Sequence, residues 1–199
     1  MFEQNSEGAD VRPLRSLPVP ELTDGTTVLR QPSTADAATV LAGTRDPLVR
    51  EFMQGVIPHQ DLDAAARWLA DVPARLWALD RAAYFSVAFA DEGPSVGWAE
   101  LVDLRPDEGA AEAAVWLLPE ARSMRTATSA LRQLCRFGFE QLGLARIDAY
   151  AAADNMPVQV VGAYIGFRRA GFRPGLFRSS RTHALHDAVH ATLLPDDLC

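Results

Sequence analysis

The segment 114–150 has the residue pattern in this sequence that is most able to do chemistry. It predicts a strand, a tight turn and a long helix, and such a unit directs unpaired backbone amides and the positive end of a helix dipole at an anion. Turns that hold phosphates usually carry glycines, which let the bare backbone close on the ligand. The turn here, 122–127, has none. The sequence thus predicts that this helix start either is a working anion site or is the remains of one.

Other reactive side chains are few. All 19 basic residues are Arg, so the chain has no lysine for a Schiff base. Cys135 falls on the apolar stripe of the predicted helix and is expected to pack as a small hydrophobic residue. The sequence also lacks a nucleophile elbow, a Walker turn and a dinucleotide fingerprint. Nucleophilic catalysis is therefore poorly supported.

Three histidines near the end of the chain, His183, His186 and His190, raise the question of a metal site. On a strand, residues 186 and 190 share a face but lie roughly 13 Å apart, a distance that one ion does not bridge. Only His183 and His186 can meet, and then through a turn. We therefore expect no metal site.

The composition predicts a cytoplasmic globular protein. Its 199 residues, 48% of them apolar, suit one domain with a proper core, and we expect a tail or surface arm at 1–20 followed by a single domain at 21–199. A formal charge of −7 argues against general binding to nucleic acid or to anionic membranes. The two Cys form no framework, the first residues are polar, and no apolar run reaches about 18 residues.

Hydrophobic periodicity predicts the elements that position the turn. Helical spacing marks 61–79, which Pro73 is expected to kink or split, and 126–142, which begins at the turn. A strand, a helix beginning near Pro157 and one or two more strands follow. This order predicts an α/β (α+β) fold with a mixed sheet. Three strands of an antiparallel meander are expected at 82–90, 95–104 and 111–118.

That order and several short strings resemble the GNAT superfamily of N-acetyltransferases, in the branch of the ribosomal-protein alanine acetyltransferases. "AEAAVWLLPEAR" resembles the strand before that family's acetyl-CoA turn, and "ATSALRQLCRFGFEQLGLARIDAYAAADN" resembles the helix, the next strand and its Asn. "GFRRAG" and "HDAVHATLLPDDL" resemble the closing segments. The likeness covers roughly residues 20–198. It implies a mostly antiparallel sheet flanked by helices, with a V-shaped splay between two parallel strands.

The resemblance also implies acetyl-CoA as the co-substrate. In the family, free amides at the end of the first strand hold the pantetheine arm, the turn holds the pyrophosphate, and an amine attacks the thioester directly. The acceptor would be a primary amine of a peptide N-terminus or of a small molecule, and a homodimer is left open. Carried over to this chain, the cofactor-binding residues are Leu117, Leu118, Arg122, Ser123, Met124, Arg125, Thr126, Ala127 and Asn155.

The turn departs from the family pattern, Arg/Gln-x-x-Gly-x-Gly/Ala, and is to that extent degenerate. Arg122 and Ala127 fit, but Arg125 replaces the central Gly, Ser123 stands where Gly is common, and Val158 replaces a Ser. Forcing a non-glycine residue into a left-handed conformation costs roughly 1–2 kcal/mol, which would weaken binding about tenfold. The Arg125 side chain either fills the diphosphate volume or swings outward and pairs with the diphosphate as a cation.

Two functions follow from these departures. The first is an N-acyltransferase that uses acetyl-CoA or a related acyl-CoA. The alternative is the same scaffold with impaired acetyl-CoA binding, used for another donor or reaction or for a non-catalytic binding role. The side chains of the turn are the feature that separates the two.

The candidate catalytic residues are Glu112, Glu100 and Tyr164. Either carboxylate would serve as general base if it faces the acceptor amine. Glu112 is favoured, because its apolar neighbours have the opposite parity on the strand and leave it on the other sheet face. Tyr164 lies near the place where many superfamily members hold a Tyr that protonates the leaving thiolate, but two residues before Gly166 instead of four. A partly buried structural Tyr is the other interpretation.

The loop 53–60 and the helix 61–79 occupy the segment that covers the acceptor in similar proteins. In that segment, Trp68 is interpreted as a core residue in preference to a platform for the substrate. His59 is interpreted as an exposed loop residue in preference to a substrate contact.

Overall fold

The computed structural model describes residues 11–90 and 93–199. Within these residues one eight-stranded sheet has the order β1-β2-β3-β4-β5-β6-β8-β7. The β5–β6 pair is parallel and the other neighbouring strands are antiparallel, so the expected mixed, mostly antiparallel fold is confirmed. The strands are β1 (Leu22–Thr23), β2 (Thr27–Arg30), β3 (Ala83–Phe89), β4 (Ser95–Arg105), β5 (Ala110–Leu117), β6 (Arg146–Ala152), β7 (Arg168–Arg178) and β8 (Leu185–Leu193).

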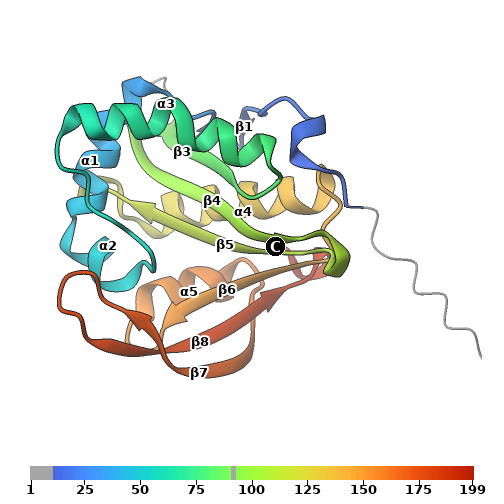
Figure 1. The fold of residues 1–199 in the computed structure, drawn as a ribbon. Coiled ribbons are helices and arrows are strands. Elements are labelled where there is room, and N and C mark those ends of the chain that lie inside the picture. The colour runs from blue at the N-terminus through green and yellow to red at the C-terminus, as the bar shows by residue number, and fades with distance from the viewer. Residues whose placement is uncertain (1–10, 91–92) are drawn as a thin grey trace, which may run out of the picture.

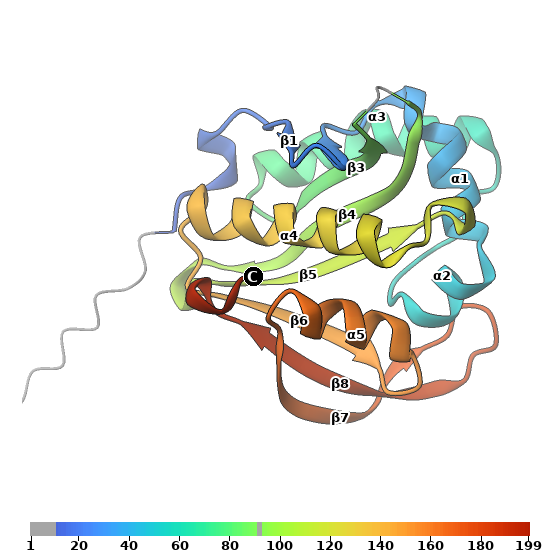
Figure 2. The same cartoon turned by 180° about the vertical axis from the view of Figure 1, so that it is seen from behind.

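Helices cover both faces of this sheet (Figures 1 and 2). On one face, the α1–α3 face, lie α1 (Ala37–Arg45), α2 (Pro47–Phe52) and α3 (Leu62–Ala78). On the other, the α4–α5 face, lie α4 (Met124–Glu140) and α5 (Met156–Tyr164). Pro73 lies inside α3, which is assigned as one continuous helix instead of splitting there.

Two clusters of buried apolar side chains hold these layers together. The larger packs α4 on the sheet, and Phe85 of β3 meets Phe137 of α4 edge to face at 5.4 Å. The smaller lies under α1, α2 and α3 and includes Trp98 and Trp116. A Cβ at Gly43 of α1 would come within 2.2 Å of the Trp116 ring, so a glycine is required for this helix to approach the sheet.

The parallel strands β5 and β6 pair only at their beginnings. Their register is Ala110 with Arg146, Ala111 with Ile147 and Glu112 with Asp148. Beyond these pairs β5 continues along β4, and β6 continues along β8. The two strands therefore separate after Glu112, which is the V-shaped splay that the resemblance implies.

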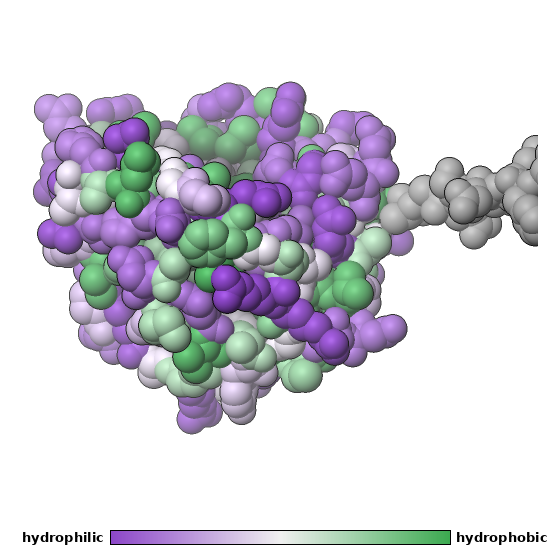
Figure 3. Space-filling model, turned by 90° about the horizontal axis from the view of Figure 1, so that it is seen from below, coloured by the Kyte–Doolittle hydropathy of each residue, from purple (hydrophilic) through white to green (hydrophobic). Residues whose placement is uncertain are grey.

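At the outer edge of the sheet, β7 pairs with β8 and its other side faces solvent. Its register shifts twice, and Pro174 falls inside the second shift. Bulges and proline on an edge strand discourage pairing with another chain. Hydrophobic residues stand in small groups between hydrophilic ones on this side of the molecule (Figure 3).

The expected arm at 1–20 falls partly outside the described residues, since residues 1–10 are not among them. In its described part, Leu14 is 1% exposed and belongs to the larger core cluster. The indole Nε1 of Trp77 also donates to the Leu17 carbonyl at 3.2 Å. In the part of the chain that the structure covers, no helix is both long and apolar enough to cross a bilayer.

Candidate functional site

The splay exposes backbone amides of β5. The Leu118 amide donates to the Val96 carbonyl of β4 at 2.8 Å. Hydrogen bonding alternates along an antiparallel strand, so the even-numbered residues of β5 bond to β4 and the amides of Val115 and Leu117 point into the gap. Leu117 thus lies where the resemblance implies, whereas Leu118 differs because its amide is already bonded. Val115 was missed, although strand alternation carries the signal for it.

The turn before α4 is a regular capped helix start. Ser123 is the N-cap, and its Oγ accepts from the Thr126 amide at 3.1 Å and bonds the Thr126 hydroxyl at 2.8 Å. The first bond of the helix runs from the Ala127 amide to the Ser123 carbonyl at 3.0 Å. The amides of Met124 and Arg125 precede that bond and are the ones left for an anion.

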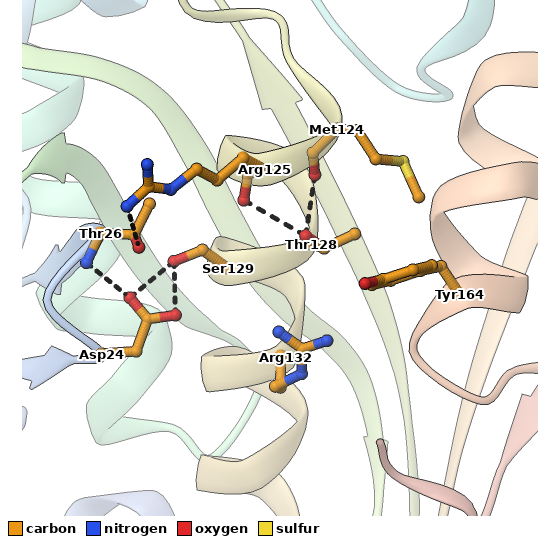
Figure 4. A pocket seen from close by; sticks show the side chains of 8 residues that line it. All are labelled: Asp24, Thr26, Met124, Arg125, Thr128, Ser129, Arg132 and Tyr164. Atoms are coloured by element: carbon orange, nitrogen blue, oxygen red, sulfur yellow. Dashed lines mark hydrogen bonds between the residues drawn. The ribbon is translucent and has the colours of Figure 1, made fainter.

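Arg125 adopts a helical conformation. Among the described non-glycine residues, positive φ angles occur at Asp80, Asp103 and His183, so the expected strain at Arg125 does not arise. The physical reason is the Ser123 cap, which starts the helix before residue 125. Its guanidinium turns outward toward Thr26, with 3.4 Å between Nη2 and the hydroxyl (Figure 4).

A cavity of about 410 Å³ lies beside the first turns of α4. Arg125 and Arg132 supply positive charge to it, and Met124 and Tyr164 supply apolar surface (Figure 4). The β1–β2 turn contributes Asp24, whose carboxylate accepts from the Ser129 hydroxyl. The cavity therefore lies next to the free amides of the helix start, on the α4–α5 face.

Arg122 differs from its expected role. Its Nη2 bonds Asp46 Oδ1 at 2.5 Å, and its Nε donates to the Leu117 carbonyl at 2.9 Å. Asp46 is also the N-cap of α2. Burial alone would raise the pKa of Asp46, but the bonds from Arg122 and from the α2 amides hold it below the ordinary value. Arg122 thus ties the turn to α2 and is not directed at an anion.

Glu100 and Glu112 lie together on the α1–α3 face. Glu100 pairs with Ala114 and Glu112 pairs with Val102, which gives both carboxylates the same parity across β4 and β5. Burial, with a smaller contribution from the charge of Glu112, raises the pKa of Glu100 to about 7. A hydrogen bond from Trp98 Nε1 at 3.0 Å opposes this rise. Burial raises the pKa of Glu112 as well. Glu100 can therefore accept a proton near neutral pH.

Aromatic side chains extend from Glu100 toward α3. The Trp98 ring lies 5.4 Å from Tyr84 and 5.5 Å from Trp68, and Trp68 lies 5.6 Å from His59. Burial and Glu100 raise the pKa of Tyr84 to about 12. His59 is half-buried, and burial lowers its pKa, so it is not an exposed loop residue. These rings form the wall beside the carboxylates.

Tyr164 lies apart from the carboxylates. It is 62% exposed at the end of α5 and lines the cavity on the α4–α5 face, so it is not a partly buried structural residue. The family's Tyr position, four residues before Gly166, is occupied here by Gly162. Tyr164 follows it by two residues, which correspond to about 200° of rotation around a helix. Tyr164 therefore faces differently from a side chain at that position. Asn155 is the N-cap residue of α5, beyond the end of β6, and its side chain does not cap the helix.

Sequence reasoning missed a polar group on the β6 side of the splay. Asp148 is 3% exposed and accepts from His190 Nε2 at 3.0 Å and from Arg105 Nη2 at 2.7 Å. The His190 ring stacks on Tyr150 with 4.7 Å between centroids. Strand alternation carries part of the signal, because it places Asp148 and Tyr150 on one face of β6, whereas the pairing of Asp148 with Glu112 appears only in the folded chain.

Histidines bind carboxylates in this structure. His186 contacts Glu51 and Asp154, and His190 contacts Asp148. Within the described ranges, three or more His, Cys, Asp or Glu side chains do not gather in a way that would hold a metal ion.

Comparison with known proteins places this arrangement in a family. The chain belongs to the acetyltransferase (GNAT) domain family, whose sequence profile matches residues 27–168. None of the curated proteins matches the chain in sequence. Solved structures share the fold at low identity.

Three of these structures illustrate the likeness. A ribosomal-protein-S5-alanine acetyltransferase from Vibrio fischeri is 17% identical with a TM-score of 0.76, covering 90% of this chain and 99% of that one. A GCN5-related N-acetyltransferase from Brucella melitensis is 16% identical with a TM-score of 0.73, covering 91% and 81%. Mycobacterium smegmatis RimJ in complex with CoA-disulfide is 21% identical with a TM-score of 0.73, covering 90% and 88%.

Proposed function

We propose that the protein transfers an acetyl or related acyl group from acyl-CoA to a primary amine of a peptide N-terminus or small molecule. One observation carries this proposal. The gap between β5 and β6 has a helix start with free amides on one face and carboxylates of raised pKa on the other. A thioester donor and an amine acceptor can therefore approach the same gap from opposite sides of the sheet.

The residues on the donor side fit acyl-CoA. The amides of Met124 and Arg125, with the outward guanidinium of Arg125, would hold the diphosphate. The amides of Val115 and Leu117 and the side chain of Asn155 would hold the pantetheine arm. Bound in this way, acyl-CoA would supply the acyl group as a thioester.

On the acceptor side, Glu100 or Glu112 would accept the proton that the amine loses. Because the pKa of Glu100 is about 7, its carboxylate is available near neutral pH and is still basic enough to take a proton. The N–H of Trp98 would hold the carboxylate in place. The neighbouring rings of Tyr84 and Trp68 would keep water from the amine.

One observation favours the alternative, a scaffold with impaired acetyl-CoA binding. The Ser123 hydroxyl already occupies the Thr126 amide, so a diphosphate would find fewer free donors than at a glycine turn. The conformation of Arg125 does not add to this cost, since the residue is helical. We therefore favour acyl transfer with a weakened donor site.

The acceptor and setting are also proposals. The likeness to a ribosomal-protein-S5-alanine acetyltransferase and to RimJ favours a peptide N-terminus over a small molecule. We place the reaction in the cytoplasm, without nucleic acid or membrane partners. The two cysteines, Cys135 and Cys199, are both free, which suits a reducing setting.

Titration with acetyl-CoA, followed by thermal shift or calorimetry, tests the donor site. At a hundred times the dissociation constant a ligand stabilises the folded state by about 2.7 kcal/mol. Ser123→Ala should bind more tightly than the wild type, because it frees the Thr126 amide. Absence of any shift at millimolar acetyl-CoA in both proteins would favour the alternative.

A further inference from the structure

The helix α5 is apolar on every side and yet exposed. Gln159 is the one residue of its nine with a strongly polar side chain. A helix that is apolar all round is normally buried in a core. All nine residues of α5 are described, and none of them is buried. The helix lies at the surface of the α4–α5 face (Figure 2), and its composition therefore indicates a surface that a partner covers.

Three large side chains form a stripe along the outer side of α5. Met156, Val160 and Tyr164 are spaced four residues apart, so they lie on one side of the helix. Met156 is 59% exposed and Val160 is 54% exposed, which is comparable with Tyr164. The inner side of the helix is anchored separately, because Val161 packs against the larger core cluster. We call Met156, Val160 and Tyr164 the α5 stripe.

The α5 stripe is continuous with the donor side of the splay. At one end Tyr164 lines the cavity beside α4 together with Met124 (Figure 4). At the other end α5 begins after Asn155, the candidate pantetheine contact. Among the described residues, the lining of the cavity does not include Met156 or Val160. A donor held in the cavity therefore covers Tyr164 and leaves the rest of the stripe in water.

Positive charge borders the stripe at the cavity. Within the described residues, neither Arg125 nor Arg132 is paired with a carboxylate: Arg125 faces Thr26, and Arg132 bonds the Cys199 carbonyl. A second copy of the chain, packed by the same face about a two-fold axis, would bring like charges together at the interface. An acidic partner would complement them. The charge therefore favours an acidic protein over self-association.

The phosphate site also bears on the form of the donor. Free acyl-CoA brings a diphosphate and a ribose phosphate, whereas a phosphopantetheine arm attached to a protein brings a single phosphodiester. The amides of Met124 and Arg125 are left for an anion at the start of α4, because the Ser123 hydroxyl holds the Thr126 amide. A single phosphodiester needs fewer donors than a diphosphate, and so suits this helix start better.

We propose that the α5 stripe docks an acidic carrier protein, which presents the acyl group as a thioester on a phosphopantetheine arm and is a better donor than free acyl-CoA. The inference rests on the acyl transfer proposed above and adds a second, preferred donor. The acceptor nitrogen bonds to the acyl carbonyl carbon as the C–S bond breaks. The amine loses its proton to the carboxylate of Glu100, and the arm leaves as a thiolate that takes up a proton from water.

A double variant, Met156→Gln with Val160→Gln, removes the stripe without touching the cavity. Gln is a better helix former than Val, so α5 should be retained, which circular dichroism and thermal melting check. Leu79→Gln is the matched control, because Leu79 is 56% exposed at the end of α3 on the opposite face of the sheet.

Calorimetry with a purified bacterial acyl-carrier protein, bearing its phosphopantetheine arm without an acyl group, is the direct test. The wild type and Leu79→Gln should bind this carrier equally, and the double variant about tenfold more weakly, as expected when apolar contacts central to an interface are lost. Affinity for free CoA should be the same in all three proteins. The carrier's affinity should also fall as salt rises, because Arg125 and Arg132 contribute to it.

Equal affinity of the wild type and the double variant for the carrier, or no binding of the carrier, would overturn the proposal. So would sedimentation of the wild type as a dimer and of the double variant as a monomer, since the stripe would then be covered by a second copy.

Kinetics with the acetylated carrier and with acetyl-CoA separate this inference from the proposed function. In the wild type kcat/KM should be higher for the acetylated carrier, and the double variant should lose about tenfold with the carrier and nothing with acetyl-CoA. Transfer from acetyl-CoA alone would refute the carrier proposal and leave the proposed function intact. Stripe-dependent binding of the carrier without transfer from either donor would refute the proposed function and leave the docking surface.

Discussion

Glu100 and Asp148 lie on the same face of the sheet, on either side of β5, and their environments differ. Burial disfavours the charged form of both carboxyl groups. Among the described residues, Glu100 has one hydrogen-bond donor, Trp98 Nε1, and a second carboxylate nearby in Glu112. Asp148 accepts from His190 and Thr192 and from two guanidinium groups. The pKa of Glu100 is accordingly raised, and that of Asp148 is lowered.

The comparison shows that the partners of a buried carboxyl group decide its role. Asp148 is saturated with donors and holds β4, β6 and β8 together at the point where the splay begins. Glu100 keeps unused acceptor capacity and a pKa near neutrality, which suits proton transfer. We therefore expect substitutions at the two sites to affect different properties.

The largest expected effect is on stability, in Asp148→Asn. This change removes the buried carboxylate that Arg105, Arg146 and His190 share, and breaking such a buried pair costs about 3 kcal/mol. Arg105 keeps its exposed partners Asp103 and Glu108, and Arg146 keeps Glu108. Urea unfolding at pH 7 measures the loss. Asp103→Asn is the control, since Asp103 is an exposed partner of Arg105 and should change stability by less than about 0.5 kcal/mol. Equal losses in the two variants would contradict the structural role of Asp148.

Glu100→Gln should leave folding intact and lower kcat/KM for the amine about 100-fold, because the proposed general base is lost. Steady-state kinetics at pH 7.5 measure the effect, with Glu120→Gln, an exposed residue before α4, as the control. Glu112→Gln should have the smaller effect. The reverse order would assign the base to Glu112.

The pH dependence of stability should differ in sign between the two sites. The pKa of Glu100 rises from 4.5 to about 7 on folding, so its stabilising contribution is present below pH 4.5 and is lost as pH rises toward about 7. The lowered pKa of Asp148 gives a contribution that is present above the ordinary 3.8 and is lost on acidification. Urea titrations of the wild type and Glu100→Gln from pH 4 to 8 should therefore diverge in favour of the variant. Parallel curves would show that Glu100 titrates normally.

The smallest expected effect is in Thr192→Val, which removes one of several donors to Asp148. The loss should be about 1 kcal/mol by urea unfolding, since the other donors remain.

Trp98→Phe is the counterpart at Glu100 and removes its hydrogen-bond donor. The acid limb of the rate profile should then move to higher pH. A limb that moves to lower pH would mean that Trp98 does not stabilise the ionised form.

Periodicity was sufficient for most of the fold. The expected strands at 95–104 and 111–118 correspond to Ser95–Arg105 and Ala110–Leu117, because each has alternating burial or a buried run between turn residues. The expected helix at 126–142 begins earlier, at Met124, since Ser123 caps it. That cap was readable from residue type, because Ser is a favoured N-cap residue.

The site was predictable where it depends on local rules. Strand alternation alone places Glu112 on the face opposite the apolar residues. Contacts between distant segments were not predictable in this way. The bond between Arg122 and Asp46 joins residues 76 positions apart, and only the folded chain shows that this guanidinium is already occupied. The environments of Glu100 and Asp148 likewise depend on which strands become neighbours.

Only three residue pairs join β5 to β6, so the sheet consists of two leaves, β1–β5 and β6–β8, that meet along a short hinge. Each leaf is stiff, because its own strands are paired along their lengths. Few backbone hydrogen bonds therefore fix the angle between the leaves, and the contact between Arg105 of β4 and Asp148 of β6 adds to them. For the acyl transfer proposed above, we expect added side-chain volume at Ala110 and Ala111, which are fully buried in the hinge, to alter the length of acyl chain that is accepted.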